Sequence, residues 1–321
     1  MSALRIIFMG TPEFAVQSLD ILVKNNYNIV GVVTMPDKPA GRGQQIHESD
    51  VKKYASEKGL NILQPEKLKD DHFIQQLREL KADLQIVVAF RMLPEIVWNM
   101  PRLGTVNLHG SLLPQYRGAA PINWAIINGE KETGVSTFFL QHQIDTGKII
   151  FREKTPIGEN ETAGEIHDRL MNIGASLILK TVQAIEQNNY PQTDQSELIA
   201  KGEQEKHAPK IFKEDCKIDW SKNISEIHNF IRGLSPYPTA FSTFHSRDNK
   251  EYSVKIFSTQ KETSEHICTT GAVVTDSKSS LKIAVKGGYI IILELQLAGK
   301  KRMSAGEFLR GFPMNTEWRV N

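Results

Sequence analysis

The chain has 321 residues, of which 40% are hydrophobic and 24% charged, and its formal net charge is +2. This length suffices for two domains with sizeable cores. Apolar runs are only a few residues long, so we expect neither a membrane-spanning helix nor a secretory signal. Two cysteines, Cys216 and Cys268, do not predict a disulfide framework, so we expect a cytoplasmic protein.

The chain opens with a strand, a helix and a second strand. Leu4–Met9 is a compact apolar run, typical of a buried parallel strand, and Ile29–Thr34 is another. Between them Pro12 suits the first turn of a helix. This order predicts a βαβ unit. The turn at Gly10 lacks the GxGxxG pattern, so we expect no dinucleotide site there.

Residues 35–47 form a loop with two prolines and two glycines. Its low apolar content predicts a surface loop, and long loops without structure of their own are often functional. Lys38 and Arg42 are its cations. Arg42 stands between two glycines, which favours an exposed guanidinium that could reach a phosphate or a base edge.

Helices and strands continue to alternate up to residue 187. Strands are predicted at 84–90 and 148–154, and helices at 51–58, 71–80, 94–98 and 162–187, the last with a capping box of Thr162 and Glu165. This alternation predicts the α/β class, with a Rossmann-like, mostly parallel sheet and helices on both faces. We assign residues 1–189 to a catalytic domain and the polar segment 190–207 to a linker.

Residues 208–314 have a different pattern. One short helix at 224–234 precedes five short β-rich runs, which predict a small OB-like β-barrel; the runs are 240–245, 254–258, 272–275, 281–285 and 289–295. Residues 200–321 carry 19 Lys and Arg against 14 Asp and Glu, whereas residues 1–199 carry 20 against 23. A basic C-terminal part favours a polyanionic partner, although an ordinary basic surface explains it equally well.

The stretch from Gly104 to Gly147 holds the candidate catalytic residues. Asn107 and His109 are two positions apart on a predicted strand, so their side chains share one side. An amide and an imidazole together could stabilise the oxyanion of an acyl carbonyl. Asp145 could orient His109 or accept a proton from an amine, although aspartate in an Asp-Thr-Gly turn is most often a turn residue.

Other catalytic patterns are missing from the sequence. There is no GxSxG, HExxH or Walker motif, and no strained elbow surrounds Ser111. The two cysteines lie outside the catalytic domain and have no partners at zinc-binding spacing. We therefore expect neither a covalent nucleophile nor a metal.

Three motifs resemble the signature of the 10-formyltetrahydrofolate-dependent formyltransferases. They are NLHGSLLP at 107–114, YRG at 116–118 and DTG at 145–147. The catalytic Asn, His and Asp of that family match Asn107, His109 and Asp145. GTPEFA at 10–15, PDKPAGRG at 36–43 and LAGKK at 297–301 resemble the branch of the family that acts on initiator tRNA, and the likeness runs from residue 6 to about 309.

The resemblance implies transfer of a formyl group from 10-formyltetrahydrofolate, a co-substrate, to the α-amine of methionine on initiator tRNA, without a metal. Asn107 and His109 would stabilise the oxyanion, and Asp145 would hold His109 and help to remove a proton. The folate pocket would include the loop after His109 and the segment after the 84–90 strand, with the residues Ser111, Leu112, Leu113, Pro114, Phe90 and Arg91.

The resemblance also implies where tRNA binds. The 36–43 loop, with Lys38 and above all Arg42, would enter the acceptor-stem region, and the barrel would bind the tRNA backbone through Lys210, Lys300, Lys301 and Arg302. A monomer is expected.

Two alternative functions remain. The first is a formyltransferase or formyltetrahydrofolate hydrolase whose acceptor is a sugar amine, glycinamide ribonucleotide or water. The second is a folate- or RNA-binding module with a decayed site. The loop and the basic barrel favour tRNA over the first; the intact catalytic set argues against the second.

Overall fold

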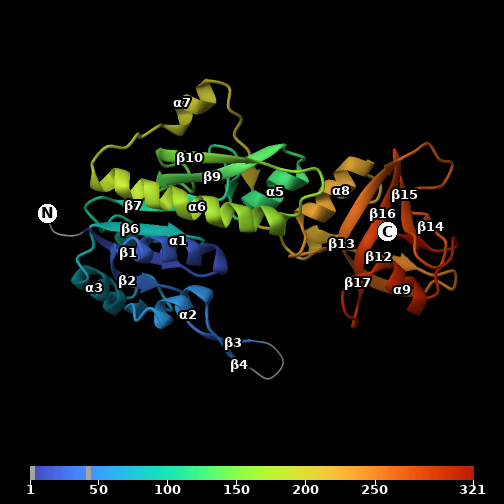
Figure 1. Cartoon of the computed structure of the whole chain (residues 1–321), viewed down its shortest axis with the longest axis horizontal. Coiled ribbons are helices and arrows are strands. Elements are labelled where there is room, and N and C mark those ends of the chain that lie inside the picture. Colours follow the sequence, from blue (N-terminus) through green and yellow to red (C-terminus); the bar gives the residue numbers. More distant parts are fainter. Residues whose placement is uncertain (1–3, 41–44) are drawn as a thin grey trace. The chain divides into compact units, whose positions relative to one another are not determined.

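The computed structural model describes residues 4–40 and 45–321 (Figure 1). Its contacts define two compact units. One includes the chain up to Gly118 together with Gly134–Thr155 and His167–His207, and the other consists of Ala119–Thr133, Pro156–Ile166 and Ala208–Asn321. The chain thus passes between the units several times, where the sequence suggested a single division at residues 190–207. The predicted domain boundaries stay a prediction.

A seven-stranded sheet forms the centre of the first unit, in the order β10-β9-β7-β6-β1-β2-β5. The five strands from β7 to β5 run parallel, and β9 pairs with β7 in the antiparallel direction (Figure 1). The predicted, mostly parallel Rossmann-like sheet is therefore confirmed. Its strands are β1 (Arg5–Gly10), β2 (Asn28–Val33), β5 (Ile62–Leu63), β6 (Leu84–Val88), β7 (Thr105–His109), β9 (Glu132–Phe139) and β10 (Ile149–Pro156).

Helices cover both faces of this sheet. Alternate residues of a strand point to opposite faces. Met9 and Val87 lie in one buried cluster with residues of α3 and α4, whereas Leu108 lies against Gly174 of α6 on the other face. The helices in this part of the chain are α1 (Glu13–Lys24), α2 (Asp50–Glu57), α3 (Asp71–Glu79), α4 (Glu95–Trp98), α6 (Ala163–Glu186) and α7 (Gln195–Ala200).

The long helix α6 begins where the sequence predicted. The Thr162 backbone N–H donates to the Glu165 carboxylate at 2.8 Å, and the Glu165 N–H donates back to the Thr162 hydroxyl at 3.3 Å. These reciprocal bonds satisfy two backbone donors that have no partner within the helix. The predicted capping box is confirmed.

The parallel strands end level with one another. Gly10 of β1 pairs in register with Val88 of β6, and Val88 pairs with Leu108 of β7. The chain turns away from β1 in opposite directions to reach β2 and β6, so the strand order reverses there. Open α/β sheets bind ligands outside the carboxyl ends of the strands at such a reversal. The loops after these three strands are therefore the expected walls of a site.

The second unit contains an antiparallel barrel. Its strands follow the order β14-β15-β16-β13-β12-β18, with β17 beside β16, and a bridge between Ala272 and Arg319 brings the two ends of this path together. The OB-like barrel is confirmed, with all five predicted strands. Its strands are β12 (Ala240–His245), β13 (Glu251–Thr263), β14 (Val273–Thr275), β15 (Leu281–Val285), β16 (Gly288–Leu297), β17 (Met303–Ser304) and β18 (Arg319–Val320).

The remaining elements are short. Helix α8 begins with a capping box of Asn223 and Glu226, and α9 with one of Ser304 and Glu307. In the described part of the chain, no helix is long and apolar enough to cross a membrane. These elements are α5 (Pro121–Ile127), α8 (Ile224–Gly233), α9 (Ala305–Gly311), the 3-10 helix η1 (Glu214–Cys216), and the strands β3 (Lys38–Ala40), β4 (Gln45–His47), β8 (Arg117–Gly118) and β11 (His207–Ala208).

His228 of α8 makes the stability of the second unit dependent on pH. It is 1% exposed and shares a 3.0 Å hydrogen bond with the Thr259 hydroxyl. Burial, and then the positive charge of Arg232, lower the pKa of His228 to about 4. The folded histidine therefore stays neutral at pH values where an unfolded histidine takes up a proton.

We expect the free energy of unfolding of this unit to fall as the pH is lowered from about 6.5 towards 4. A pKa depressed by roughly 2.5 units corresponds to a loss of about 3 kcal/mol, because acid protonates the unfolded chain first. Urea unfolding at pH 7 and 4.5 measures this loss, which should be smaller in His228→Gln. An equal loss in His228→Gln and the wild type would contradict the assignment.

Candidate active site

Strand β7 places Asn107 and His109 on the same face of the sheet. Asn107 pairs in register with Val87, so both residues face the side that α3 and α4 cover. His109 is 7% exposed, and Asn107 is half-buried. Within the described part of the chain, the Asn107 side-chain amide has no hydrogen-bond partner. Its N–H groups remain available to a bound carbonyl oxygen.

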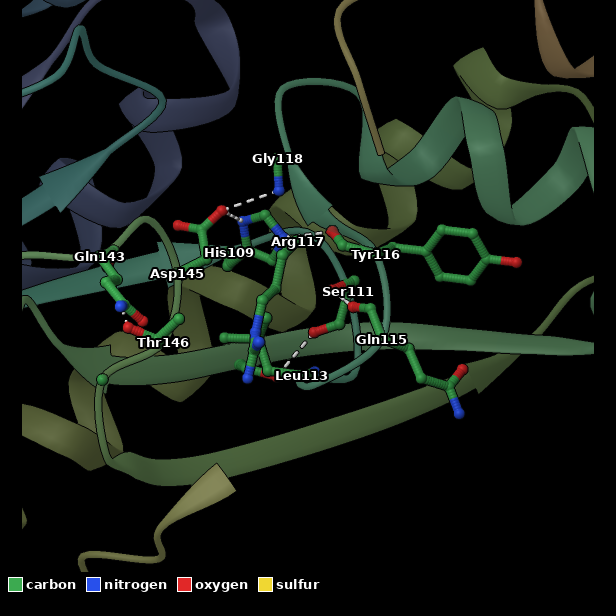
Figure 2. A network of polar contacts seen from close by, with 12 residues as sticks. His109, Ser111, Leu113, Gln115, Tyr116, Arg117, Gly118, Gln143, Asp145 and Thr146 are labelled. Carbon is green, nitrogen blue, oxygen red and sulfur yellow. Dashed lines mark hydrogen bonds and ion pairs between the residues drawn. The ribbon is translucent and has the colours of Figure 1, made fainter. Parts of the chain in front are cut away.

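The two ring nitrogens of His109 face different groups (Figure 2). Nε2 lies 2.8 Å from the backbone oxygen of Tyr116. A carbonyl only accepts hydrogen bonds, so Nε2 carries a proton. Nδ1 lies 3.7 Å from Oδ2 of Asp145, which is close enough for charge interaction but too long for a hydrogen bond. Nδ1 is therefore the ring atom that can exchange a proton.

Asp145 has a left-handed backbone and accepts a hydrogen bond from another backbone segment. Its φ of 54° lies in the left-handed region, which aspartate tolerates better than most residues. Its Oδ2 accepts a 2.9 Å hydrogen bond from the Gly118 N–H, the same oxygen that faces His109 (Figure 2). Only 11% of the Asp145 side chain is exposed. The structure thus brings together two of the three predicted catalytic side chains.

Gly147 allows the Asp145 loop to turn into β10. A Cβ added at Gly147 would lie 1.6 Å from the Phe139 carbonyl oxygen, a distance that no side chain could tolerate. The last position of the Asp-Thr-Gly motif therefore requires glycine because another strand's backbone approaches it.

Residues 190–207, predicted as a linker, contribute a buried side chain to this site. Gln195 of α7 is 2% exposed, and its amide donates to the carbonyl oxygens of Asp145 and Gly147, each at 2.8 Å. The Gln195 oxygen accepts from Nε and Nη2 of Arg117 at 3.1 and 2.7 Å. Sequence reasoning missed Gln195 because its segment is polar and has no periodicity.

The predicted folate residues after His109 mostly shape the loop. Ser111, Leu113 and Pro114 are buried, and Leu112 is half-buried. The Ser111 hydroxyl donates to the Gln115 carbonyl at 2.6 Å. Leu113 lies in a cluster with Phe138 and Ile149. These side chains therefore pack inside the protein. The loop can contact a ligand through its backbone groups and its shape.

Phe90 and Arg91 follow β6 at the edge of the sheet where the carboxyl ends of β1, β6 and β7 lie. The Arg91 guanidinium lies 5.6 Å from the Phe90 ring and donates to the backbone oxygens of Pro65 and of Glu66, the latter at 2.8 Å. Arg91 also lines a cavity of about 660 Å³ with Leu68, Lys69 and residues 92–96. Met92 and Ile96 of this cavity are 75% and 50% exposed. Such a cavity has the size and apolar lining of a small-molecule site.

Arg42 lies outside the described residues, but the base of its loop is described. Lys38 is exposed at the start of β3, which pairs with β4 as a hairpin. Lys52 of α2 forms ion pairs with Asp37 before β3 and with Glu48 after β4, the second at 2.7 Å. One ammonium group thus ties both ends of the hairpin to α2.

The four basic residues predicted in the barrel unit are all exposed. Lys210 lies over the Phe212 ring at 5.1 Å. Arg302 lies over the Phe257 ring at 4.4 Å and forms an ion pair with Glu294. Lys300 and Lys301 follow the Gly299 turn. The Glu294 carboxylate thus partly neutralises the charge of Arg302.

The chain is similar to known proteins over nearly its full length. Residues 4–182 match the formyl transferase family and residues 210–313 the C-terminal domain of formyl transferases. The chain is 56% identical to the methionyl-tRNA formyltransferase of Bacteroides thetaiotaomicron over 318 residues, covering 99% of this chain and 98% of the relative. It is 53% identical to that of Flavobacterium johnsoniae, with both chains fully covered.

Solved structures share the fold. The N-formyltransferase of Helicobacter canadensis, in complex with folinic acid and dTDP-3-aminofucose, is 22% identical with a TM-score of 0.65, covering 94% of this chain and all of that one. HypX of Aquifex aeolicus in complex with tetrahydrofolic acid is 18% identical with a TM-score of 0.63, covering 97% of this chain and 48% of that one.

Proposed function

The chain belongs to the formyl transferase family, and from this membership we propose that it transfers the formyl group of 10-formyltetrahydrofolate to the α-amine of methionine on initiator tRNA. The observation that carries the proposal is the similarity over the full length to methionyl-tRNA formyltransferases, in both units of the chain. The product is the formylated methionyl-tRNA that starts protein synthesis.

The reaction exchanges one acyl bond for another. The neutral α-amine attacks the formyl carbon, and a tetrahedral intermediate with a negatively charged oxygen forms. The bond from the formyl carbon to N10 of the folate then breaks. The amine loses one proton and N10 gains one, so no oxidant or reductant is needed.

Asn107, His109 and Asp145 supply what this reaction requires. The side-chain amide of Asn107 donates to the developing oxyanion. In place of the oxyanion contact that the resemblance implies for His109, we assign it a proton at Nδ1, because Nε2 is already bonded to the Tyr116 carbonyl. The Asp145 carboxylate, 3.7 Å away, stabilises the positive charge that results. Together they offer a route for the proton that leaves the amine.

The folate lies at the carboxyl edge of the sheet in this proposal. The pterin occupies the space between the loop 111–114 and the segment that begins at Phe90, and the cavity beside Arg91 takes part of the molecule. The Arg91 guanidinium is suited to bind a carboxylate of the folate tail. We assign the 10-formyl form as the donor because the chain's motifs resemble those of the 10-formyltetrahydrofolate-dependent formyltransferases.

The tRNA acceptor explains the charged features outside this site. The hairpin that Lys52 anchors carries Lys38 and Arg42 towards the acceptor stem, and the barrel unit contacts the phosphate backbone through Lys210, Lys300, Lys301 and Arg302. We place the enzyme in the cytoplasm as a monomer, where charged tRNA is available to it.

Arg42→Ala is expected to lower kcat/KM for methionyl initiator tRNA by about 10-fold to 100-fold, because one charge-assisted contact is worth about 1.5–3 kcal/mol. The Kd for folate should stay unchanged. Steady-state formylation kinetics and a folate-binding titration measure the two effects. Equal loss of tRNA and folate binding would contradict the role of the loop.

Acceptor competition tests the proposed function. The purified protein is given 10-formyltetrahydrofolate and, in parallel, methionine-charged initiator tRNA, methionine-charged elongator tRNA and a nucleotide-linked amino sugar. We expect a far higher kcat/KM for the initiator tRNA than for the other acceptors. A preference for the amino sugar would favour the alternative acceptors of this family instead.

A further inference from the structure

A single buried amide connects the two segments that place the Asp145 carboxylate. Gln195 donates to the carbonyl oxygens of Asp145 and Gly147, and its own oxygen accepts two bonds from Arg117. The amide of glutamine has two N–H donors and two oxygen lone pairs. All four are used here, so the Gln195 side chain has only one favourable orientation.

The two bonded segments are those that meet at the carboxylate. Asp145 itself is on one of them. The other ends at Gly118, whose N–H donates to Oδ2 of Asp145 and which directly follows Arg117. Gln195 therefore holds both partners of the hydrogen bond between Asp145 and Gly118. It bonds to the backbone of Asp145 on one segment and to the side chain of Arg117, next to Gly118, on the other. Glu205 adds an ion pair to Arg117, which keeps that guanidinium in place.

The rest of the Asp145 loop is exposed and has few contacts. The His142 ring lies 5.4 Å from the Trp98 ring and 3.5 Å from the Glu95 carboxylate, and the Thr146 hydroxyl donates to the Gln143 carbonyl at 3.0 Å. Residues 141–144 are exposed, and Ile144 is 59% exposed. The backbone of Asp145 adopts a left-handed conformation that must be maintained by its surroundings. Two hydrogen bonds from a buried donor, one on either side of Thr146, supply that restraint.

We propose that Gln195 is a positioning residue, which sets the separation between Asp145 and His109 for formyl transfer. The attraction between a carboxylate and an imidazolium varies inversely with their distance, so a shift of the loop changes how strongly the charged ring is stabilised. The inference rests on the proposed function. It extends the site into a segment that the sequence presents as a polar linker.

Gln195→Glu separates the two halves of this contact. The carboxylate keeps the acceptor for Arg117 but loses both donors to the Asp145 loop, and its oxygens then face carbonyl oxygens. Gln192→Glu is the matched control, because Gln192 is exposed on the same segment and the charge change is equal. Gln195→Met is a second variant, which removes all four bonds without adding a charge.

We expect Gln195→Glu to lower kcat by about 10-fold to 100-fold, since a displacement of about 1 Å at a reacting group can cost roughly 100-fold. The KM values for folate and tRNA should change less than about twofold. The pH dependence of kcat should also shift, because the charge environment of His109 changes. Gln195→Met should show the same pattern, and Gln192→Glu should match the wild type.

Hydrogen exchange gives a readout that does not depend on activity. Backbone amides of residues 141–148 should exchange faster in both Gln195 variants than in the wild type and in Gln192→Glu. Unchanged kcat and unchanged exchange in the variants would overturn the proposal, as would a lower melting temperature with wild-type kcat and pH profile. If the wild type formylates no tRNA, the proposed function fails, while the exchange data still decide whether Gln195 holds the loop.

Discussion

Replacement of His109 by alanine is expected to lower kcat for formyl transfer by about 1,000-fold, within the range of roughly 10² to 10⁴ that a general acid–base or oxyanion group supplies. The change removes the ring whose Nδ1 faces Asp145 and whose Nε2 is bonded to the Tyr116 carbonyl. Single-turnover formylation of charged initiator tRNA with saturating folate measures this step without product release.

The His109 variant should still fold. The loss of a partner for the Tyr116 carbonyl costs about 1–3 kcal/mol, which is a fraction of the stability of a domain. His72→Ala is the matched control, because His72 is exposed on α3, away from the Asp145 loop. Near-normal turnover of His109→Ala would remove His109 from the catalytic set. A melting temperature close to that of the wild type shows that any loss is catalytic.

Asp145→Asn is expected to lower kcat by about 1,000-fold as well. The asparagine oxygen can still accept the hydrogen bond from the Gly118 N–H, so the loop keeps its shape while the negative charge disappears. Without that charge, the imidazolium of His109 loses its nearest stabilising group. A comparable substitution in the serine protease triad reduces kcat by about 10⁴.

Asp145→Ala separates charge from loop geometry. It removes both the charge and the bond to Gly118, so it should be at least as slow as Asp145→Asn. If Asp145→Asn keeps nearly full activity while Asp145→Ala does not, the carboxylate only holds the loop. If both variants turn over at the wild-type rate, Asp145 has no part in the reaction.

Much of the fold follows from local patterns. The apolar runs at the start of the chain and at 84–90 are long enough to identify as buried strands, and the period of 162–187 identifies α6. Strands β5, β17 and β18 have two residues each, too few for any period to be visible. The grouping of residues 119–133 with the barrel unit depends on contacts far apart in the sequence, so no local pattern could predict it.

Of the residues that form the site, the sequence predicts only those that stand in recognisable motifs. Asn107, His109 and Asp145 stand in recognisable motifs, and the structure brings the latter two within 3.7 Å. Their nearest partners are backbone groups of Tyr116 and Gly118, which carry no signal of their own in the sequence. Gln195 is likewise an ordinary residue in a polar segment until the fold buries it.

The fate of a labelled formyl group tests the central claim most directly. The protein is incubated with 10-formyltetrahydrofolate that carries ¹³C in the formyl group and with methionine-charged initiator tRNA, and the products are analysed by mass spectrometry. We predict that the label appears as N-formylmethionine on the tRNA, in an amount equal to the tetrahydrofolate formed. Release of the label as free formate, with the methionine unmodified, would contradict the account.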